Sequence, residues 1–152
     1  MERRNAWLSY TEAEEKELEQ VAKAYRNFLN VGKTERECVT QIIREARAAG
    51  YESLEEKTAK GEKLKAGDKV YTVGMKKIIA LFHIGQDDIS EGMNILGAHI
   101  DSPRLDVKQN PLYEDTDLAY LDTHYYGGVK KYQWVTIPLA IHGVVAKKDG
   151  SV

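Results

Sequence analysis

The sequence predicts an α/β fold in which two N-terminal helices precede a buried sheet and a β-rich segment follows. Three observations lead to this prediction. Two stretches with helical spacing of apolar residues each begin with a capping box, short and strongly apolar runs come after them, and apolar and polar residues alternate after Pro103. Helices followed by nearly continuous apolar strands are typical of layered α/β folds whose sheet is covered on at least one face.

The first predicted helix lies between Thr11 and Gly32. Thr11-Glu12-Ala13-Glu14 fits a capping box, and Gly32 is a common kind of helix terminator. Between them, apolar side chains recur every three or four residues, as expected for one face of an amphipathic helix. They are Leu18, Val21, Ala22, Tyr25, Phe28 and Leu29.

The second predicted helix begins with the box Thr34-Glu35-Arg36-Glu37 and ends at Gly50. Cys38 lies on its apolar face, and we interpret it as a small core residue rather than a nucleophile, because nothing nearby suggests a lowered thiol pKa. As the one cysteine of the chain, it has no partner for an internal disulfide. The predicted buried residues are Cys38, Val39, Ile42, Ile43, Ala46 and Ala49.

The rest of the chain contains the predicted strands. Residues 51–68 are polar and rich in glycine, which predicts a loop with room for a short helix. Apolar runs predict strands at 69–73, 77–84 and 94–98, and one or two more within 132–147, broken near Pro138 or His142-Gly143. A polar segment is expected around Asn110-Pro111, after the alternating stretch. Because a turn signal precedes Val152, we expect the chain to be cut off there.

Composition and charge exclude several kinds of partner. The 22 basic and 24 acidic residues give a formal net charge of -2, which provides no broad positive field for nucleic acid or an anionic membrane. Lysines within 57–77 are mixed with carboxylates, so we interpret this stretch as solvated surface. No apolar run approaches the ~20 residues that span a bilayer. The lone cysteine and the charged N-terminus, which lacks an apolar signal core, indicate a cytoplasmic protein.

The segment most informative about chemistry is Gly97-Ala98-His99-Ile100-Asp101-Ser102-Pro103. In extended chain, residues two apart point to the same side, so His99 and Asp101 can face one site. A neutral imidazole can bind zinc through one nitrogen while a carboxylate holds the other N–H and fixes the tautomer. Pro103 keeps Ser102 extended. Taken alone, His-x-Asp is a weak pattern and is more often an ordinary polar pair.

The longer string Gly-Ala-His-Ile-Asp-Ser-Pro-Arg-Leu-Asp, at 97–106, resembles the first metal-ligand motif of the aspartyl aminopeptidase and aminopeptidase I family of dizinc exopeptidases. The resemblance is strongest to the bacterial branch and continues through 108–114 and 123–134. It implies that His99 is a zinc ligand and that Asp101 is the catalytic-site carboxylate that orients this ring. It also implies an activity: water activated by the metal attacks the first peptide bond, with a glutamate as general base.

The resemblance further implies an architecture and a set of partners. Residues 1–105 correspond to the N-terminal part of a metallopeptidase catalytic domain, and 106–152 to the beginning of an inserted β-rich dimerisation domain. The family's remaining parts lie downstream of this sequence: a metal-bridging aspartate, a glutamate pair, another carboxylate ligand and a final histidine. The complete protein is therefore expected to bind two Zn²⁺, cleave peptide substrates and form dimer-based homo-oligomers, up to dodecamers.

The sequence leaves two functional hypotheses. The first is a cytoplasmic zinc aminopeptidase, of which these 152 residues alone are expected to be inactive because one imidazole holds zinc only weakly. The second is a non-catalytic relic or an assembly module derived from the peptidase. Light scattering and co-purification would distinguish them: a stable, stoichiometric complex that works without metal indicates the module, and a monomer that aggregates indicates an incomplete fragment.

Several other residues allow both a structural and a functional interpretation, and we favour the structural one for each. We expect His83 to be a buried structural histidine, His124 to lie in a turn, and His142 to be structural within a strand. Gly127-Gly128 is expected to form a plain turn rather than an anion-binding loop. Arg104 is expected to make a surface ion pair, with steering of a substrate carboxylate as the alternative. Packing is expected for four aromatic residues: Tyr125, Tyr126, Tyr132 and Trp134.

Overall fold

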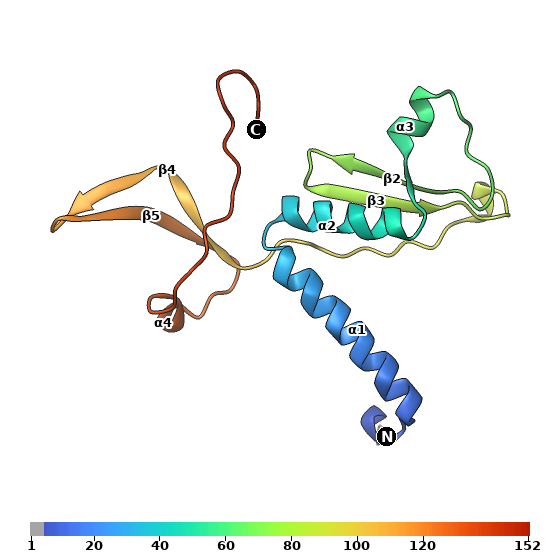
Figure 1. Ribbon diagram of the computed structural model, residues 1–152, viewed down its shortest axis with the longest axis horizontal. Helices are drawn as coiled ribbons and strands as arrows, with labels where there is room; N and C mark the ends of the chain where they lie inside the picture. The colour runs from blue at the N-terminus through green and yellow to red at the C-terminus, as the bar shows by residue number, and fades with distance from the viewer. Residues whose placement is uncertain (1–4) are drawn as a thin grey trace. The chain divides into compact units, whose positions relative to one another are not determined.

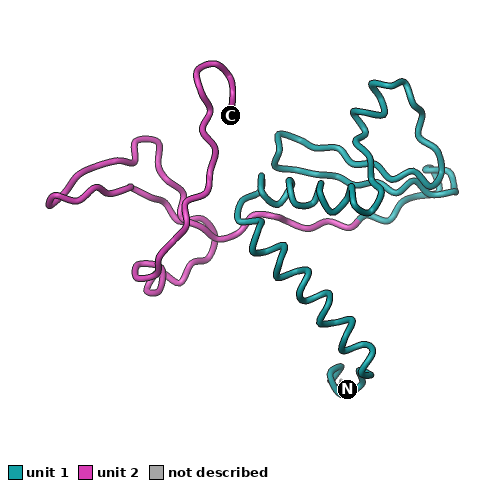
Figure 2. Tube along the Cα trace, viewed as in Figure 1, with its two compact units in different colours: residues 1–95 teal, residues 96–152 magenta. Residues whose placement is uncertain are grey.

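The computed structural model describes residues 5–152 and divides into two compact units (Figures 1 and 2). One unit ends at Ile95, and the other comprises Leu96–Val152. The mixed α/β content agrees with the predicted fold class. The domain boundary expected at 105/106 lies inside the second unit. It falls within strand β4, which begins at Arg104.

The first predicted helix is present as α1 (Glu12–Val31), after a short 3-10 helix, η1 (Ala6–Leu8). Both halves of its capping box form: the Glu14 backbone N–H donates to Thr11 Oγ1 at 3.3 Å, and the Thr11 N–H donates to a Glu14 carboxylate oxygen at 2.8 Å. No side chain of α1 is buried, and Val21 is 64% exposed. The periodicity therefore predicted the helix correctly, although its apolar face stays largely open.

The second helix is also confirmed, as α2 (Glu35–Ala48), with a capping box between Thr34 and Glu37. It ends where Gly50 adopts a left-handed φ of 86° and the Tyr51 N–H reaches back to the Ala46 carbonyl. Its buried residues are Cys38, Val39, Gln41 and Ala46. Cys38 is thus a core residue, as predicted. The prediction for Ala49 was wrong: this residue caps the helix and is exposed.

A three-stranded sheet lies against α2 in the first unit (Figure 1). Strand β1 (Glu52–Ser53) pairs in parallel with β2 (Lys69–Gly74), and β2 pairs antiparallel with β3 (Ile78–His83). The short helix α3 (Leu54–Ala59) follows β1, and a second 3-10 helix, η2 (Ile89–Glu91), follows β3. Val39 of α2 and Val70 and Tyr71 of β2 are among the most deeply buried residues and form the centre of the core.

The second unit is built on a long hairpin of β4 (Arg104–Asp115) and β5 (Leu118–Tyr126). The strands pair antiparallel from Arg104↔Tyr126 to Asp115↔Leu118, with a register shift between Val107 and Leu112. Pro111 lies in this irregular stretch, where the missing N–H is tolerated. The polar segment expected around Asn110-Pro111 is therefore part of β4. A four-residue helix, α4 (Lys131–Trp134), follows the hairpin.

Two groups of predicted strands are absent from the described residues. Neither 94–98 nor 132–147 forms a strand, and residues 131–134 are helical instead. An apolar stretch forms a strand only where a neighbouring strand supplies hydrogen-bond partners. No other described segment pairs with these residues. Their side chains are accordingly exposed: Leu96 fully, and Ile141 by 84%.

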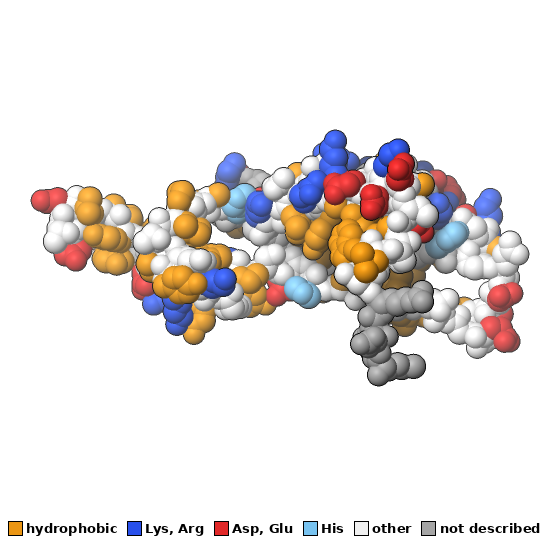
Figure 3. Space-filling model, turned by 90° about the horizontal axis from the view of Figure 1, so that it is seen from below, with side chains coloured by type: hydrophobic (Ala, Val, Ile, Leu, Met, Phe, Trp, Pro, Cys, Tyr) orange, Lys and Arg blue, Asp and Glu red, His pale blue; other side chains and the backbone are white. Residues whose placement is uncertain are grey.

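Large apolar side chains reach the surface of both units, and Figure 3 shows many of them on one face of the molecule. On the sheet of the first unit, Ile78 is 69% exposed and Phe82 45% exposed. Among the described residues, none of the helices combines the length and the apolarity needed to cross a membrane.

Candidate metal site at His99 and Asp101

His99 and Asp101 lie side by side in the irregular segment that precedes β4. His99 Nδ1 is 3.1 Å from Asp101 Oδ1 and also 3.1 Å from the Asp101 backbone oxygen. A carbonyl and an ionised carboxylate can only accept hydrogen bonds, so Nδ1 must carry the proton. The lone pair of the neutral ring is then on Nε2. The His99 side chain is 86% exposed, so the ring is not enclosed in apolar packing.

The other oxygen of the Asp101 carboxylate is held by Tyr126, the last residue of β5. The tyrosine hydroxyl donates to Asp101 Oδ2 at 2.5 Å. This bond is the largest cause that lowers the pKa of Asp101; its own backbone N–H and His99 act in the same direction, while partial burial opposes them. Asp101 is therefore ionised at neutral pH and available to orient the imidazole.

The open end of the hairpin, where β4 begins and β5 ends, lies next to His99 and Asp101. Arg104, opposite Tyr126 in the ladder, donates from Nε to Asp106 Oδ1 at 2.7 Å, which confirms the predicted ion pair. Its guanidinium carbon also lies 4.2 Å from the centre of the Tyr126 ring, a cation–π contact. Beyond Tyr126, a β-carbon on Gly127 would lie only 3.4 Å from Pro103 Cα, so the chain next to Asp101 passes close to the strand end.

The other three histidines do not join this pair. His83 ends β3 and is exposed, which corrects the prediction that it is buried. His124 lies within β5 and stacks on Tyr125 at 5.3 Å, so the prediction of a turn was wrong as well. His142 is in an irregular segment rather than a strand.

The described residues contain no complete metal site. Within 5–152, no three His, Cys, Asp or Glu side chains come together in a way that could hold an ion. His99 and Asp101 fit one zinc ligand and its orienting carboxylate, whereas structural and catalytic zinc sites use three or four protein ligands.

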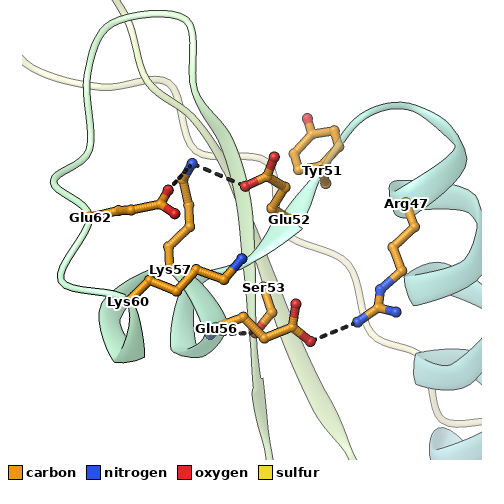
Figure 4. A pocket seen from close by; sticks show the side chains of 8 residues that line it. All are labelled: Arg47, Tyr51, Glu52, Ser53, Glu56, Lys57, Lys60 and Glu62. Atoms are coloured by element: carbon orange, nitrogen blue, oxygen red, sulfur yellow. Dashed lines mark hydrogen bonds and ion pairs between the residues drawn. The ribbon is translucent and has the colours of Figure 1, made fainter.

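A separate cavity of about 420 Å³ lies in the first unit (Figure 4). Most of its charges are paired with one another: Lys57 Nζ is 3.0 Å from Glu52 and 3.2 Å from Glu62, and Arg47 is 3.2 Å from Glu56. These pairs agree with the interpretation of the lysine-rich stretch as a surface of mixed charge. The cavity holds no histidine and gives no sign of metal chemistry. Its lining is Arg47, Tyr51, Glu52, Ser53, Glu56, Lys57, Lys60 and Glu62.

Sequence reasoning assigned Tyr126 only to packing and missed its bond to Asp101. The signal that could have revealed it is the aromatic-rich stretch 118–126, which follows the turn at Thr116-Asp117. Both turn residues adopt positive φ, 52° and 60°, as a two-residue type I′ hairpin turn requires. Recognising that hairpin would have paired β5 with β4, but not Tyr126 with Arg104, because the register shift between Val107 and Leu112 displaces the pairing by three residues.

Comparison with known proteins gives the class of protein to which this geometry belongs. A family model described as "Aminopeptidase I zinc metalloprotease (M18)" matches residues 28–152. Among curated proteins, "Probable M18 family aminopeptidase 1" of Clostridium acetobutylicum is 58% identical over 151 residues, and its counterpart in Thermotoga maritima is 45% identical over 155 residues. Each match covers 99% of this chain and 32% of the relative.

Solved structures agree with this class. The crystal structure of aminopeptidase I from Borrelia burgdorferi B31 matches with a TM-score of 0.88 at 39% identity, over 97% of this chain and 35% of that one. Aminopeptidase I from Clostridium acetobutylicum matches with a TM-score of 0.82 at 58% identity, over 99% of this chain and 33% of that one. The chain belongs to the M18 family of zinc metalloproteases. It spans about a third of the length of the relatives that it matches.

Proposed function

We propose that this protein acts as a zinc-dependent aminopeptidase in which His99 is a metal ligand and Asp101 orients its ring. The observation that carries the proposal is the contact between His99 Nδ1 and the Asp101 carboxylate at 3.1 Å, on a ring that is 86% exposed. Metal-binding histidines characteristically donate their second ring N–H to a carboxylate or a carbonyl, which fixes the tautomer and raises the basicity of the ligating nitrogen. Membership of the M18 family supports the same assignment.

Zinc in such a site supplies a Lewis acid that activates water and polarises the peptide carbonyl. The contribution of this chain is to present Nε2 of His99 as a ligand and to keep the proton on Nδ1. The other ligands must come from outside the described residues, because no three His, Cys, Asp or Glu side chains of these come together to hold an ion. From the resemblance to the family, we propose that the general base also lies outside them and that the complete site holds two zinc ions. We expect the 152-residue chain alone to be inactive.

The proposal extends to substrate, assembly and location. The substrates are peptides, cleaved at the first peptide bond. Residues 1–105 form part of the catalytic domain and 106–152 begin a dimerisation domain, within a dimer-based homo-oligomer. The hairpin supports this assignment, because it exposes apolar side chains that a subunit partner could cover: Leu112 is 72% exposed and Leu118 57%. The balanced charge and the single cysteine support a cytoplasmic location.

The same exposed hairpin also favours a second candidate function, a non-catalytic assembly module. The two candidates differ in whether residue 99 matters for metal-dependent cleavage. The module requires the hairpin surface but not the imidazole, whereas the peptidase requires the imidazole.

The test uses a chimera in which residues 1–152 replace the matching third of the Clostridium acetobutylicum relative. Cleavage of aminoacyl p-nitroanilides is measured for the 152-residue chain, the chimera and two variants of the chimera. We expect no activity from the chain alone, chelator-sensitive activity from the chimera, its loss in His99→Ala, and its retention in the matched control His83→Ala. Retention of full activity in His99→Ala would overturn the proposal, and so would chelator-sensitive cleavage by the chain alone.

A further inference from the structure

A continuous set of hydrogen bonds leads from strand β5 to the ring of His99. Tyr126 donates its hydroxyl proton to Asp101 Oδ2 at 2.5 Å, and Asp101 Oδ1 accepts the Nδ1 proton of His99 at 3.1 Å. The first distance is in the range of a charge-assisted O–H···O⁻ bond, which is stronger than a bond between neutral groups. The two oxygens of a single carboxylate thus have different partners, and together these fix its rotation.

The position of Tyr126 is determined by the regular part of the fold. It ends β5 and pairs in the ladder with Arg104, which begins β4. The Arg104 guanidinium covers the ring, with 4.2 Å between the guanidinium carbon and the ring centre. A tyrosine that is fixed at a strand end and covered by arginine is a well-defined donor.

Asp101, in contrast, belongs to a segment without regular structure. The segment approaches the hairpin closely at Pro103, beside Gly127, which has a φ of 71° and no side chain to block the approach. The backbone oxygen of Asp101 also accepts from His99 Nδ1 at 3.1 Å, but this contact does not restrain the carboxylate. Of the contacts that hold the carboxylate in the described residues, the bond from Tyr126 is the one that ties it to a strand.

We propose that Tyr126 is a positioning residue, whose hydroxyl holds the Asp101 carboxylate where it accepts the Nδ1 proton of His99 and so keeps Nε2 presented as a metal ligand. This inference rests on the proposed function for the role of Nε2. The hydrogen-bond chain itself needs no metal, and it is therefore tested in the metal-free protein.

The test is ¹⁵N NMR of the imidazole of His99 in the 152-residue chain, at a pH where the ring is neutral. The nitrogen shifts and the two-bond couplings to the ring protons give the ratio of the Nδ1–H to the Nε2–H tautomer. We expect the Nδ1–H form to dominate in the original chain. In Tyr126→Phe, we expect the ratio to fall by about threefold or more, which corresponds to a coupling energy at the low end for neighbours in one hydrogen-bond network.

Tyr125→Phe is the matched control. It removes the same atom from the adjacent residue of β5, whose ring instead stacks on His124 and lies 4.3 Å below Lys131 Nζ. Its tautomer ratio should equal that of the original chain. Tyr126→Phe keeps the ring under Arg104, and cross-strand contacts between residues 104 and 126 will show that the hairpin is intact. If those contacts are lost, Tyr126→Trp, which keeps a large aromatic ring but lacks the hydroxyl, replaces it in the same comparison.

The outcomes separate this inference from the proposed function. An unchanged tautomer ratio in Tyr126→Phe with an intact hairpin overturns the inference, even if His99→Ala abolishes the activity of the chimera. A dominant Nε2–H form in the original chain overturns it too. If the ratio falls as expected but His99→Ala stays active, the hydrogen-bond chain is supported and the peptidase role of His99 is refuted.

Discussion

Replacing Gly32 by alanine should destabilise the first unit through one specific contact. Gly32 is buried just after α1, and a β-carbon there would lie 2.7 Å from Cys38 Sγ, 3.3 Å from the Phe28 carbonyl oxygen and 3.4 Å from Cys38 Cα. The φ of Gly32 is -90°, so alanine suffers no left-handed strain. The cost therefore comes from overpacking against a cysteine that is itself 4% exposed in the core.

The change in the free energy of unfolding caused by Gly32→Ala depends on two opposing effects. Overpacking of a well-packed site costs about 1–3 kcal/mol. Replacing glycine by alanine also reduces the conformational entropy of the unfolded chain, which offsets roughly 0.4–1 kcal/mol of this cost where the native backbone suits alanine. We therefore expect Gly32→Ala to lower the free energy of unfolding by about 1–2 kcal/mol. In a Cys38→Ala background the closest atom is gone and only the backbone contacts at 3.3 and 3.4 Å remain, so the same change at Gly32 should cost much less.

Native-state amide hydrogen exchange is a suitable assay, because it reports on the first unit separately from the hairpin. The slowest amides of the core, at Val39 and Val70, are followed in the original chain, both single variants and the double variant. The double-mutant cycle should give a coupling energy of about 1–2 kcal/mol between the two sites. If Gly32→Ala costs the same in both backgrounds, the contact with the sulfur does not determine the destabilisation.

Three further predictions concern capping, the thiol and the carboxylate. Thr34→Ala removes the acceptor of the Glu37 N–H and should cost about 1 kcal/mol in hydrogen-exchange stability, with Thr40→Ala, on the exposed side of α2, as the control. Burial, then Glu37 and Glu35, raise the pKa of the Cys38 thiol, so iodoacetamide should react far more slowly with folded than with unfolded chain. The thiol's contribution to stability should be complete below its unfolded pKa and lost as pH rises through the folded pKa, a dependence that disappears in Cys38→Ala. Because Tyr126 is the main cause of the lowered pKa of Asp101, ¹³C NMR titration should show this pKa rising in Tyr126→Phe; the ionised carboxylate stabilises the fold above its unfolded pKa, and this contribution is lost as pH falls through the folded pKa.

Local signals in the sequence were sufficient to predict the two long helices, α1 and α2. The boxes at Thr11 and Thr34 satisfy the first free N–H groups of each helix within a few residues, so no distant partner is needed. The β2–β3 hairpin was predictable for a related reason, since both of its strands are close in the sequence and consistently apolar. Cys38 and Val39 were correctly assigned to the core because helical spacing places them on the face that meets the sheet.

The failures came where structure depends on a partner. Leu96 and Ile141 belong to apolar segments that read as strands, but no described strand pairs with them. Strand β5 was missed for the opposite reason, because its polar and aromatic residues gain their regularity from the ladder with β4. The contact between His99 and Asp101 was predictable from a spacing of two, whereas the bond from Tyr126 spans 25 residues and requires the hairpin register.

In the proposed function, His99 presents Nε2 to zinc while Asp101 holds Nδ1. The most direct measurement is anomalous diffraction at the zinc edge from crystals of the chimera that carries residues 1–152. We predict a zinc peak about 2.0–2.1 Å from Nε2 of His99, the usual zinc–nitrogen distance, with Nδ1 still bonded to the Asp101 carboxylate. A fully occupied zinc site that leaves His99 without a bond to the metal, or that binds it through Nδ1, would refute this role of His99.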